Sequence, residues 1–425
     1  MSFSLARCRA TARGRALTLA LPLALVALVA VPSAGQARPA AAEATAASVT
    51  PAAPAVTHPS CDPSPPAGYW ACLSRWKRLL PVSPARISAA GTASPAAAGA
   101  KVPLPKDGLT PADIVSAYKL PATGGKGITI GIVDAYDDPK AESDLKVYRS
   151  AFKLPACTTA NKCFRKVDHN GGTKYPEPDA AWGGEISLDV QAVSAACPEC
   201  KILLVEASDA TTDGLAKAVK TAVKLGANVV SNSYGGSESA AEEKAVGTTY
   251  KNAKVPMVVS SGDEGFSAAS SPAVLPSVWS VGGTVLRRTG KTWSESAWRY
   301  GSSACSLVVA KPSFQKDKLC QKRTVADVSL VADGFAVYDT FGLGEDNGWV
   351  LMSGTSLSSP LLSAMMGRAG HPSKIADPGY AYRHAKYYQD ITTGHNGYCV
   401  DALCNAAPGY DAPTGIGAPR GLKGL

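Results

Sequence analysis

Residues 353–360, Ser-Gly-Thr-Ser-Leu-Ser-Ser-Pro, have the composition of a turn that presents a serine hydroxyl. A short apolar run precedes them, and Pro360 is tolerated in a first helical turn, so we expect Ser356 to lie between a strand and a helix. Backbone N–H groups at the N-terminus of such a helix stabilise negative charge that develops on a bound group. The pattern indicates a serine nucleophile, although a polar helix cap has the same composition.

Two carboxyl residues spaced four apart could supply the proton chemistry that a serine nucleophile needs. Glu185 and Asp189 lie in residues 182–191, whose apolar spacing is helical, so both carboxyl groups should share one helix face. Two close carboxylates do not both ionise readily, so one should have a raised pKa and share a proton with the other. That arrangement permits general acid and base catalysis in acid solution. The alternative is an acidic stripe on a solvated surface helix.

A third carboxyl residue, Asp263, follows an apolar strand pattern in a Ser-Gly-Asp turn. By itself it fits a turn-forming residue. The histidines of the chain suggest no base, because none stands in the His-Gly-Thr-His setting that accompanies Gly-Thr-Ser in subtilisins. They are His58, His169, His371, His384 and His395.

The segments that must position these residues follow an α/β pattern. Short β-branched apolar runs alternate with helical patterns, which is typical of parallel strands covered by helices on both faces. Several strands should end in polar, glycine-containing turns, which in open sheets line one ligand-binding crevice. We therefore predict a doubly wound, mostly parallel α/β sheet flanked by helices. The expected strands are residues 128–133, 201–205, 227–231, 255–260 and 278–281, and the expected helices include residues 213–225 and 240–253.

The N-terminal part of the chain differs from this pattern. Residues 1–37 contain four arginines, then an apolar run and then small residues, which is typical of a secretory signal peptide. The apolar run is shorter than the ~20 residues of a membrane-spanning helix. We therefore expect a secreted, extracellular protein with no stable membrane association after the signal is removed.

Residues 38–105 are rich in alanine, proline and serine and are expected to form a leader or a short pro-segment. Residues 106–425 then remain as one large domain. Without the signal peptide the formal charge falls from +9 to +5, since its four arginines are its only charged residues. So small a positive charge does not indicate a surface that binds nucleic acid, and we expect no nucleic-acid partner.

Eleven cysteines are present, of which Cys8 lies in the signal peptide. The other ten form neighbouring couples, and an even number suits an oxidising compartment. Nearest-neighbour bridging is the simplest of many connectivities, and each bridge would close a short loop. The couples are Cys61 with Cys72, Cys157 with Cys163, Cys197 with Cys200, Cys305 with Cys320, and Cys399 with Cys404.

The candidate catalytic residues occur in an ordered set of motifs. Glu185 and Asp189 come first, followed by Ser-Asn-Ser-Tyr-Gly at 231–235, Ser-Ser-Gly-Asp at 260–263 and Gly-Thr-Ser at 354–356. This order resembles the sedolisins, a family of serine-carboxyl peptidases. The resemblance implies a subtilisin-like fold and hydrolysis of protein or peptide substrates at acidic pH, and we expect a monomer.

The resemblance covers about residues 108–425 and implies a role for each candidate. Ser356 would attack the peptide carbonyl, and Glu185 would act first as general base and then as general acid. Asp189 would hold and tune Glu185 through a shared proton. Asp263 would stand protonated in the oxyanion hole, because an ionised carboxylate there would repel the intermediate.

The C-terminal segment resembles the calcium loop of the same family. Oxygen atoms of the kind it offers suit a hard cation, and we expect one structural Ca²⁺. The implied ligands are the side chains of Asp390 and Asp411 and the carbonyl oxygens of Ile391, Ala407 and Gly409. The family usually has glycine where Ala407 stands, and a plain turn-rich loop is the alternative.

Three features depart from the family pattern. The leader is short, Ser353 replaces a glycine before Gly354, and Tyr234 stands where tryptophan is common. We expect these to alter the substrate walls rather than the chemistry. Two other functions stay open: a subtilisin-type peptidase that pairs Asp134, which follows residues 128–133, with a histidine, and a catalytically silent secreted binding protein on the same scaffold.

Overall fold

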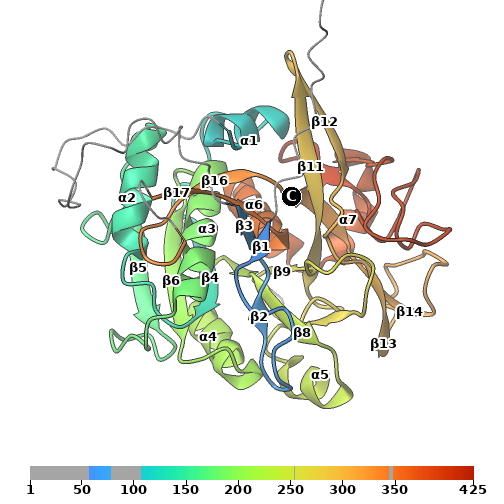
Figure 1. The fold of residues 1–425 in the computed structure, drawn as a ribbon, viewed down its shortest axis with the longest axis horizontal. Helices are drawn as coiled ribbons and strands as arrows, with labels where there is room; N and C mark the ends of the chain where they lie inside the picture. Colours follow the sequence, from blue (N-terminus) through green and yellow to red (C-terminus); the bar gives the residue numbers. More distant parts are fainter. Residues whose placement is uncertain (1–56, 78–106, 253, 344–347) are drawn as a thin grey trace, which may run out of the picture. The chain divides into compact units, whose positions relative to one another are not determined.

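The computed structural model describes residues 57–77, 107–252, 254–343 and 348–425 (Figure 1). The predicted signal peptide, residues 1–37, lies outside the described residues, as does most of the predicted leader. Within the described parts of the chain, no helix is both long enough and apolar enough to cross a bilayer.

The apolar runs of the sequence form a central sheet of eight strands. They are β4 (Thr129–Ala135), β5 (Phe164–Asp168), β6 (Lys201–Ala207), β7 (Val229–Asn232), β9 (Met257–Ser260), β11 (Trp279–Thr289), β12 (Thr292–Ala297) and β15 (Val328–Val331). The strand order is β12-β11-β9-β7-β4-β6-β5, and β15 also pairs with β11. Every neighbouring pair is parallel except β11 with β12.

Helices cover both faces of this sheet (Figure 1). They are α1 (Pro111–Ala117), α2 (Ala141–Ala151), α3 (Ala180–Ala196), α4 (Thr212–Lys224), α5 (Ala240–Val246), α6 (Thr355–Ala369), α7 (Gly379–Arg383) and the 3-10 helices η2 (Pro372–Ile375) and η3 (Ala385–Tyr387). Ile202 and Leu204 of β6 join the core that contains α2, α3 and α6. Leu203 and Val205 join the core that contains α4 and α5. Because successive side chains enter opposite cores, the strands show no polar alternation, and the predicted doubly wound α/β fold is confirmed.

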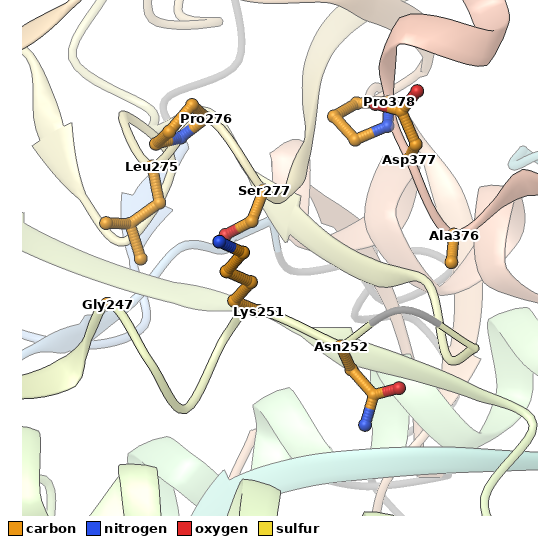
Figure 2. A pocket seen from close by; sticks show the side chains of 9 residues that line it. All are labelled: Gly247, Lys251, Asn252, Leu275, Pro276, Ser277, Ala376, Asp377 and Pro378. Carbon is orange, nitrogen blue, oxygen red and sulfur yellow. The ribbon is translucent and has the colours of Figure 1, made fainter.

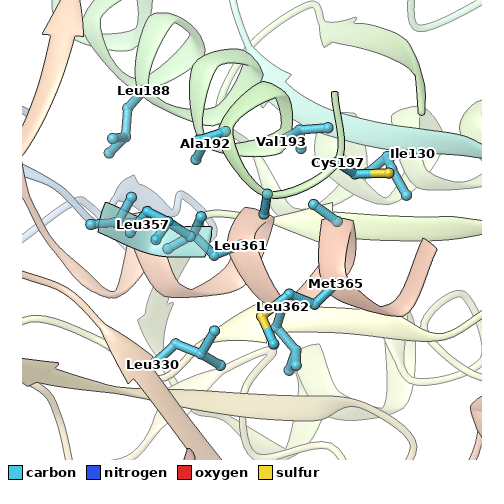
Figure 3. Packing of buried hydrophobic residues seen from close by; sticks show 14 of the residues in the cluster. Ile130, Leu188, Ala192, Val193, Cys197, Leu330, Leu357, Leu361, Leu362 and Met365 are labelled. Atoms are coloured by element: carbon cyan, nitrogen blue, oxygen red, sulfur yellow. The ribbon is translucent and has the colours of Figure 1, made fainter. Parts of the chain in front are cut away.

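The packing of α3 against α6 brings the predicted catalytic segments together. Figure 3 shows Leu188 and Ala192 of α3 facing Leu357 and Leu361 of α6. All four side chains are fully buried. Burial of a leucine side chain of this kind contributes about 1.5–3 kcal/mol to stability. This contact therefore fixes where the polar residues of α3 lie relative to the N-terminus of α6.

The position of Pro360 differs from the prediction. Helix α6 begins at Thr355, so Pro360 lies in its second turn rather than in the first. A proline there has no N–H to donate to the carbonyl of Ser356 four residues earlier. The hydroxyl of Ser233 lies 3.4 Å from that carbonyl and can donate in its place. The polar neighbour explains how the helix accommodates this proline.

Element boundaries were otherwise predicted to within a few residues, with two exceptions. The helix expected over residues 240–253 ends at Val246, where Gly247 forms the C-cap. Strand β11 continues to Thr289, because its outer half pairs with β12 in a hairpin that the apolar pattern does not reveal.

Smaller sheets flank the central one, and two of them include strands from the predicted leader. Their strand orders are β1-β3-β17-β16 and β10-β8-β2, and the pairs β13-β14 and β18-β19 stand alone. Strands β1, β2 and β3 belong to residues 57–77, so this part of the leader packs into the same unit as the remaining described residues. The strands are β1 (His58–Pro59), β2 (Ala71–Cys72), β3 (Arg75–Lys77), β8 (Tyr234–Ser237), β10 (Ser270–Ser271), β13 (Ala304–Ala310), β14 (Lys322–Val325), β16 (Phe335–Tyr338), β17 (Trp349–Ser353), β18 (Tyr388–Gln389) and β19 (Ala418–Pro419).

Disulfide bridges join the five neighbouring cysteine couples named above. The longest sequence separation between two bridged cysteines is 15 residues. Each bridge therefore closes a local loop and does not join elements that are distant in sequence. Nearest-neighbour bridging is therefore confirmed for the ten described cysteines.

Candidate active site

Ser356 is the second residue of α6 and follows a sharp turn out of β17. That turn needs Gly354, whose φ is +145°, and a Cβ there would stand 2.3 Å from the carbonyl oxygen of Leu73. The backbone N–H of Ser356 donates to the same carbonyl at 3.1 Å. The Ser356 hydroxyl donates to the carbonyl of Ser233 at 3.3 Å. The serine thus lies at a helix N-terminus, where backbone donors face a carbonyl oxygen.

Three buried carboxyl groups interact with one another beside this serine. Glu185 and Asp189 lie four residues apart on α3, which is buried over all but its first two residues. Asp134 is the penultimate residue of β4. Each of the three side chains has no exposed surface. The alternative that Glu185 and Asp189 form a solvated surface stripe is therefore wrong.

Burial raises the pKa of Glu185 well above its ordinary value, and the charge of Asp134 raises that pKa further. The hydroxyls of Ser356 and Ser74 act in the opposite direction, although neither makes a hydrogen bond of regular geometry to the carboxyl. Burial also raises the pKa of Asp134 to about 8. Protons therefore stay on this cluster at pH values where carboxyl groups in water have lost them.

Asp189 is hydrogen-bonded to Ser233, whose carbonyl also accepts the hydrogen bond from the Ser356 hydroxyl. The Ser233 hydroxyl donates to Asp189 Oδ2 at 2.8 Å, and this bond lowers the pKa of Asp189. Burial and the charges of Asp134 and Glu185 outweigh it, so the pKa of Asp189 is raised well above its usual range. Ser233 thus links the acid pair to Ser356.

Asp263 supplies a fourth buried carboxyl group. Its Oδ1 accepts hydrogen bonds from the N–H and the hydroxyl of Thr355, at 2.8 and 2.9 Å. Its Oδ2 has no hydrogen-bond partner among the described residues and lies 2.9 Å from where a Cβ on Gly354 would be. Burial raises the pKa of Asp263 to about 7, against the bonds from Thr355 and the charge of Arg75. A protonated carboxyl with one free oxygen can donate a hydrogen bond.

No imidazole belongs to this cluster. His169 accepts a hydrogen bond from the Ser208 N–H, and the ring nitrogens of His384 and His395 face backbone carbonyls. Among the described residues, no histidine hydrogen-bonds to Ser356 or to the cluster, and both oxygens of Asp134 lack hydrogen-bond partners. The alternative that pairs Asp134 with a histidine therefore has no support from the geometry.

The structure brings the four predicted catalytic residues together. Asp134 and Ser233 also interact with the pair of Glu185 and Asp189. From the sequence, Asp134 was predicted only as a possible partner for a histidine, and Ser233 was noted only as part of a motif. Asp134 is the penultimate residue of β4, and Ser233 directly follows β7, which is the neighbour of β4 in the sheet. The carboxyl ends of adjacent parallel strands meet at one edge of a sheet. The positions of Asp134 and Ser233 at the ends of two predicted strands could therefore have indicated that they lie together.

The predicted cation loop places its two carboxylates near each other. Asp390 accepts a hydrogen bond from the Gly409 N–H at 2.8 Å, and Asp411 accepts one from the Ala407 N–H at 3.0 Å. Burial chiefly, and the charge of Asp390 in part, raise the pKa of Asp411 to about 6. In the described parts of the chain, no three acidic, histidine or cysteine side chains are grouped to hold a metal. The donor set fits a hard cation only if backbone carbonyls, such as that of Ile391, complete it.

A cavity of about 580 Å³ shares no residue with the carboxyl cluster (Figure 2). Its lining contains one lysine and one aspartate but no arrangement of a hydroxyl with paired carboxyl groups. This lining therefore offers no counterpart of the arrangement around Ser356. The lining residues are Gly247, Lys251, Asn252, Leu275, Pro276, Ser277, Ala376, Asp377 and Pro378.

Comparison with known proteins agrees with this geometry. The model of the subtilase family matches residues 175–375, a range that contains the two α3 acids, Asp263 and Ser356. Among solved structures, Pseudomonas sedolisin, a serine-carboxyl proteinase complexed with two molecules of pseudo-iodotyrostatin, superposes with a TM-score of 0.64 at 24% identity. That match covers 74% of this chain and 96% of the sedolisin chain. The class of protein is therefore one with a subtilisin-like fold.

Two proteins with similar sequences indicate which peptidases this chain is related to. Kumamolisin of Bacillus sp. (strain MN-32) is 28% identical over 357 residues, which cover 74% of this chain and 62% of kumamolisin. Xanthomonalisin of Xanthomonas sp. (strain T-22) is 28% identical over 387 residues, which cover 72% of this chain and 45% of xanthomonalisin. The chain thus spans about three fifths or less of the length of these relatives. The chain is a relative of the sedolisins, and the resemblance expected from its motifs is confirmed.

We predict that folding stability falls as the pH rises from about 4 to about 8. The folded chain keeps protons on Asp134, Asp263 and Glu295, whose pKa values burial raises to about 8, 7 and 7. The unfolded chain releases these protons near pH 4. The folded state then binds more protons than the unfolded state, so the stability present below about pH 4 is lost progressively as the pH approaches the folded pKa values.

Thermal unfolding of the Ser356→Ala variant, which keeps all of these carboxyl groups, measures this effect. The melting temperature should be higher at about pH 4.5 than at about pH 7.5 by at least about 5 °C. An equal or higher melting temperature at the upper pH would mean that these carboxyl groups ionise as freely in the folded chain as in water.

Proposed function

We propose that this chain is a serine-type peptidase that hydrolyses peptide bonds at acidic pH. One observation carries the proposal: the hydroxyl of Ser356 lies at a helix N-terminus beside a buried carboxyl pair, Glu185 and Asp189, with no histidine in contact among the described residues. The relationship to the sedolisins supports a protein or peptide as the substrate.

Glu185 acts as the general base in this proposal. Because Glu185, Asp189 and Asp134 share a dry environment, like charges keep protons on some of the three while one is ionised. Ionised Glu185 takes the proton of the Ser356 hydroxyl as the oxygen attacks the substrate carbonyl. Protonated Glu185 then donates that proton to the leaving nitrogen, and the steps repeat with water to release the acyl group.

Asp189 positions and tunes Glu185. A protonated Asp189 can donate to the Ser233 hydroxyl, which frees that hydroxyl to donate to the carbonyl of Ser356. The proton on Asp189 thus keeps charge off the second acid while Glu185 is ionised. Loss of this proton would place two carboxylates side by side and raise the pKa of Glu185 beyond use as a base in acid.

Asp263 and the backbone N–H of Ser356 form the oxyanion hole. In its protonated form Asp263 donates through the oxygen that lacks a partner, while Thr355 holds the other oxygen. Its pKa of about 7 keeps it protonated throughout the acid range. Above that pH the carboxylate would repel the developing oxyanion, which confines activity to acid solution.

We also infer that the protein acts outside the cytoplasm. Five disulfide bridges suit an oxidising compartment, and the N-terminal pattern suits export.

Ser356→Ala and Glu185→Gln should each lower kcat/KM for a quenched fluorescent peptide at about pH 4 by at least ~100-fold, because one removes the nucleophile and the other the base. Melting temperatures check that both variants fold. Glu177→Gln, which changes an exposed carboxyl of the same type, is the matched control and should keep wild-type activity. Wild-type activity in either site variant would reject the assigned roles.

We further propose that Asp390 and Asp411, with backbone oxygens of their loop, hold one structural Ca²⁺. Two carboxylates kept this close repel each other until a cation neutralises them. A bound ion would stabilise the native chain by mass action.

Excess chelator at about pH 6 should therefore lower the melting temperature by several degrees. Asp390→Asn should have a lower melting temperature than wild type in Ca²⁺, and it should respond less to the chelator. Glu177→Gln should respond to the chelator as wild type does. If chelation leaves the melting temperature of the wild-type chain unchanged, the proposed Ca²⁺ site is rejected.

A further inference from the structure

Residues 262–266 form the turn that carries the carboxyl donor of the proposed oxyanion hole, and we call them the oxyanion turn. Residues 300–303, the support segment, bind this turn along its backbone. The Gly262 carbonyl accepts a hydrogen bond from the Ser302 N–H at 2.8 Å, and the Ser302 hydroxyl accepts one from the Glu264 N–H at 3.0 Å. The two bonds lie on either side of the carboxyl residue in the chain, so the support segment fixes the backbone from which that carboxyl projects.

The two segments are in close contact over their whole length. The Gly265 N–H donates to the carbonyl of Tyr300 at 2.8 Å, and the Gly265 carbonyl accepts from the Ser303 N–H at 3.3 Å. A Cβ placed on Gly262 would stand 2.6 Å from the Ser302 hydroxyl oxygen, which is closer than such atoms approach. The oxyanion turn therefore follows any movement of the support segment.

Asn396 binds both segments at once. Its backbone carbonyl accepts a hydrogen bond from the Phe266 N–H of the oxyanion turn at 2.9 Å. Its side-chain amide donates to the Gly301 carbonyl at 2.6 Å and to the Ser303 hydroxyl at 2.8 Å. One residue thus joins the turn to the segment that supports it.

The side chain of Asn396 is 4% exposed, and a buried amide is costly unless it is hydrogen-bonded. Its nitrogen makes the two bonds to the support segment, whereas its oxygen has no hydrogen-bond partner among the described residues. An apolar side chain would fill the same space without an unpaired oxygen. The two donor bonds are therefore the feature that accounts for an asparagine at this position.

Asn396 belongs to the C-terminal loop, residues 390–411, that carries the proposed cation ligands. The Asn396 N–H donates to the carbonyl of Cys404 at 2.9 Å, and the Ser303 hydroxyl donates to the carbonyl of Leu403 at 2.5 Å. A disulfide bridge at Cys404 closes the tip of the loop. The loop is thus braced internally, and Asn396 is where it hydrogen-bonds to the oxyanion turn.

The position of Asp263 depends on this bracing. Thr355 binds only Oδ1 of Asp263, whereas Oδ2, the oxygen that donates in the proposed mechanism, has no partner among the described residues. The backbone of the oxyanion turn therefore decides where Oδ2 lies. A displacement of about 1 Å between reacting groups can cost on the order of 100-fold in rate.

We propose that Asn396 is a positioning residue for catalysis, which holds Asp263 at the developing oxyanion by joining the oxyanion turn to the support segment. This inference rests on the proposed peptidase function, in which Asp263 is the oxyanion donor. It gives the C-terminal loop a part in catalysis that is separate from cation binding.

The first test compares kcat with KM for the Asn396→Ala variant. The oxyanion forms only when Ser356 attacks, so a displaced Asp263 weakens binding of the transition state and not of the bound substrate. We expect kcat for a quenched fluorescent peptide at about pH 4 to fall at least ~10-fold, while KM changes by less than about 2-fold. An unchanged kcat, or a loss that lies wholly in KM, would overturn the inference.

Asn405→Ala is the matched control. Asn405 lies in the same loop and also donates through its side-chain amide, but to the carbonyls of Cys399 and Asp401 within the loop, at 3.1 and 2.9 Å. This variant should keep kcat within about 2-fold of wild type. A loss equal to that of Asn396→Ala would mean that the fold of the loop, and not the bonds of Asn396, is what catalysis needs.

A double-mutant cycle with Asp263→Ala separates positioning from a general weakening of the fold. If Asn396 acts through Asp263, its replacement by alanine should cost less than about 3-fold in kcat once the carboxyl is gone. The same fold-loss in both backgrounds would contradict the proposal. Melting temperatures of all variants check that they are folded.

Ser303→Ala keeps the proposal testable if Asn396→Ala does not fold. It removes one of the two acceptors of the Asn396 amide and should lower kcat at least ~3-fold with little change in KM. Wild-type kcat in this variant would reject the inference alone, provided that activity is still lost in Ser356→Ala. Wild-type activity in both Ser356→Ala and Asp263→Ala would instead reject the proposed function.

Discussion

Exclusion of water from carboxyl groups is the condition on which the site depends. In water, aspartate and glutamate are ionised above about pH 4, and they could neither share a proton nor donate a hydrogen bond to an oxyanion. Packing of α3 on α6 buries Glu185 and Asp189 against Ser356, and the end of β4 adds Asp134. Asp263 is buried by the turn that precedes α6. The apolar contacts of the fold thus set the protonation state of the site.

The leader completes this exclusion. Residues 57–77 pair with β8 and β17, and the Leu73–Ser74 peptide covers the serine and its base. The raised pKa values of Glu185 and Asp263 therefore belong to a closed site.

Much of this arrangement follows from local sequence. Apolar runs predicted the central parallel strands, and the spacing of Glu185 and Asp189 predicted one helix face, because both signals depend on neighbours in the chain. The contribution of Asp134 could not be assigned in this way, since it depends on which strands lie side by side. Residues 38–105 were interpreted from composition as a leader or short pro-segment, and composition could not reveal that Trp70 is buried against Tyr234 and Tyr250, which are far away in sequence. Pro360 was placed one turn early, because the hydroxyl that compensates for it comes from Ser233, between β7 and β8, which is distant in sequence.

The most direct test of the central claim is the pH dependence of kcat/KM for the enzyme and its Asp263→Asn variant. If buried carboxyl groups supply both the base and the oxyanion donor, wild-type activity should decline by about pH 7, near the pKa of Asp263. Asparagine is a neutral donor at any pH, so the variant should be slower in acid but should lose this alkaline decline or show it at least about one pH unit higher. Wild-type activity that rises through neutral pH, as an imidazole base would produce, or an identical decline in both enzymes, would contradict the account.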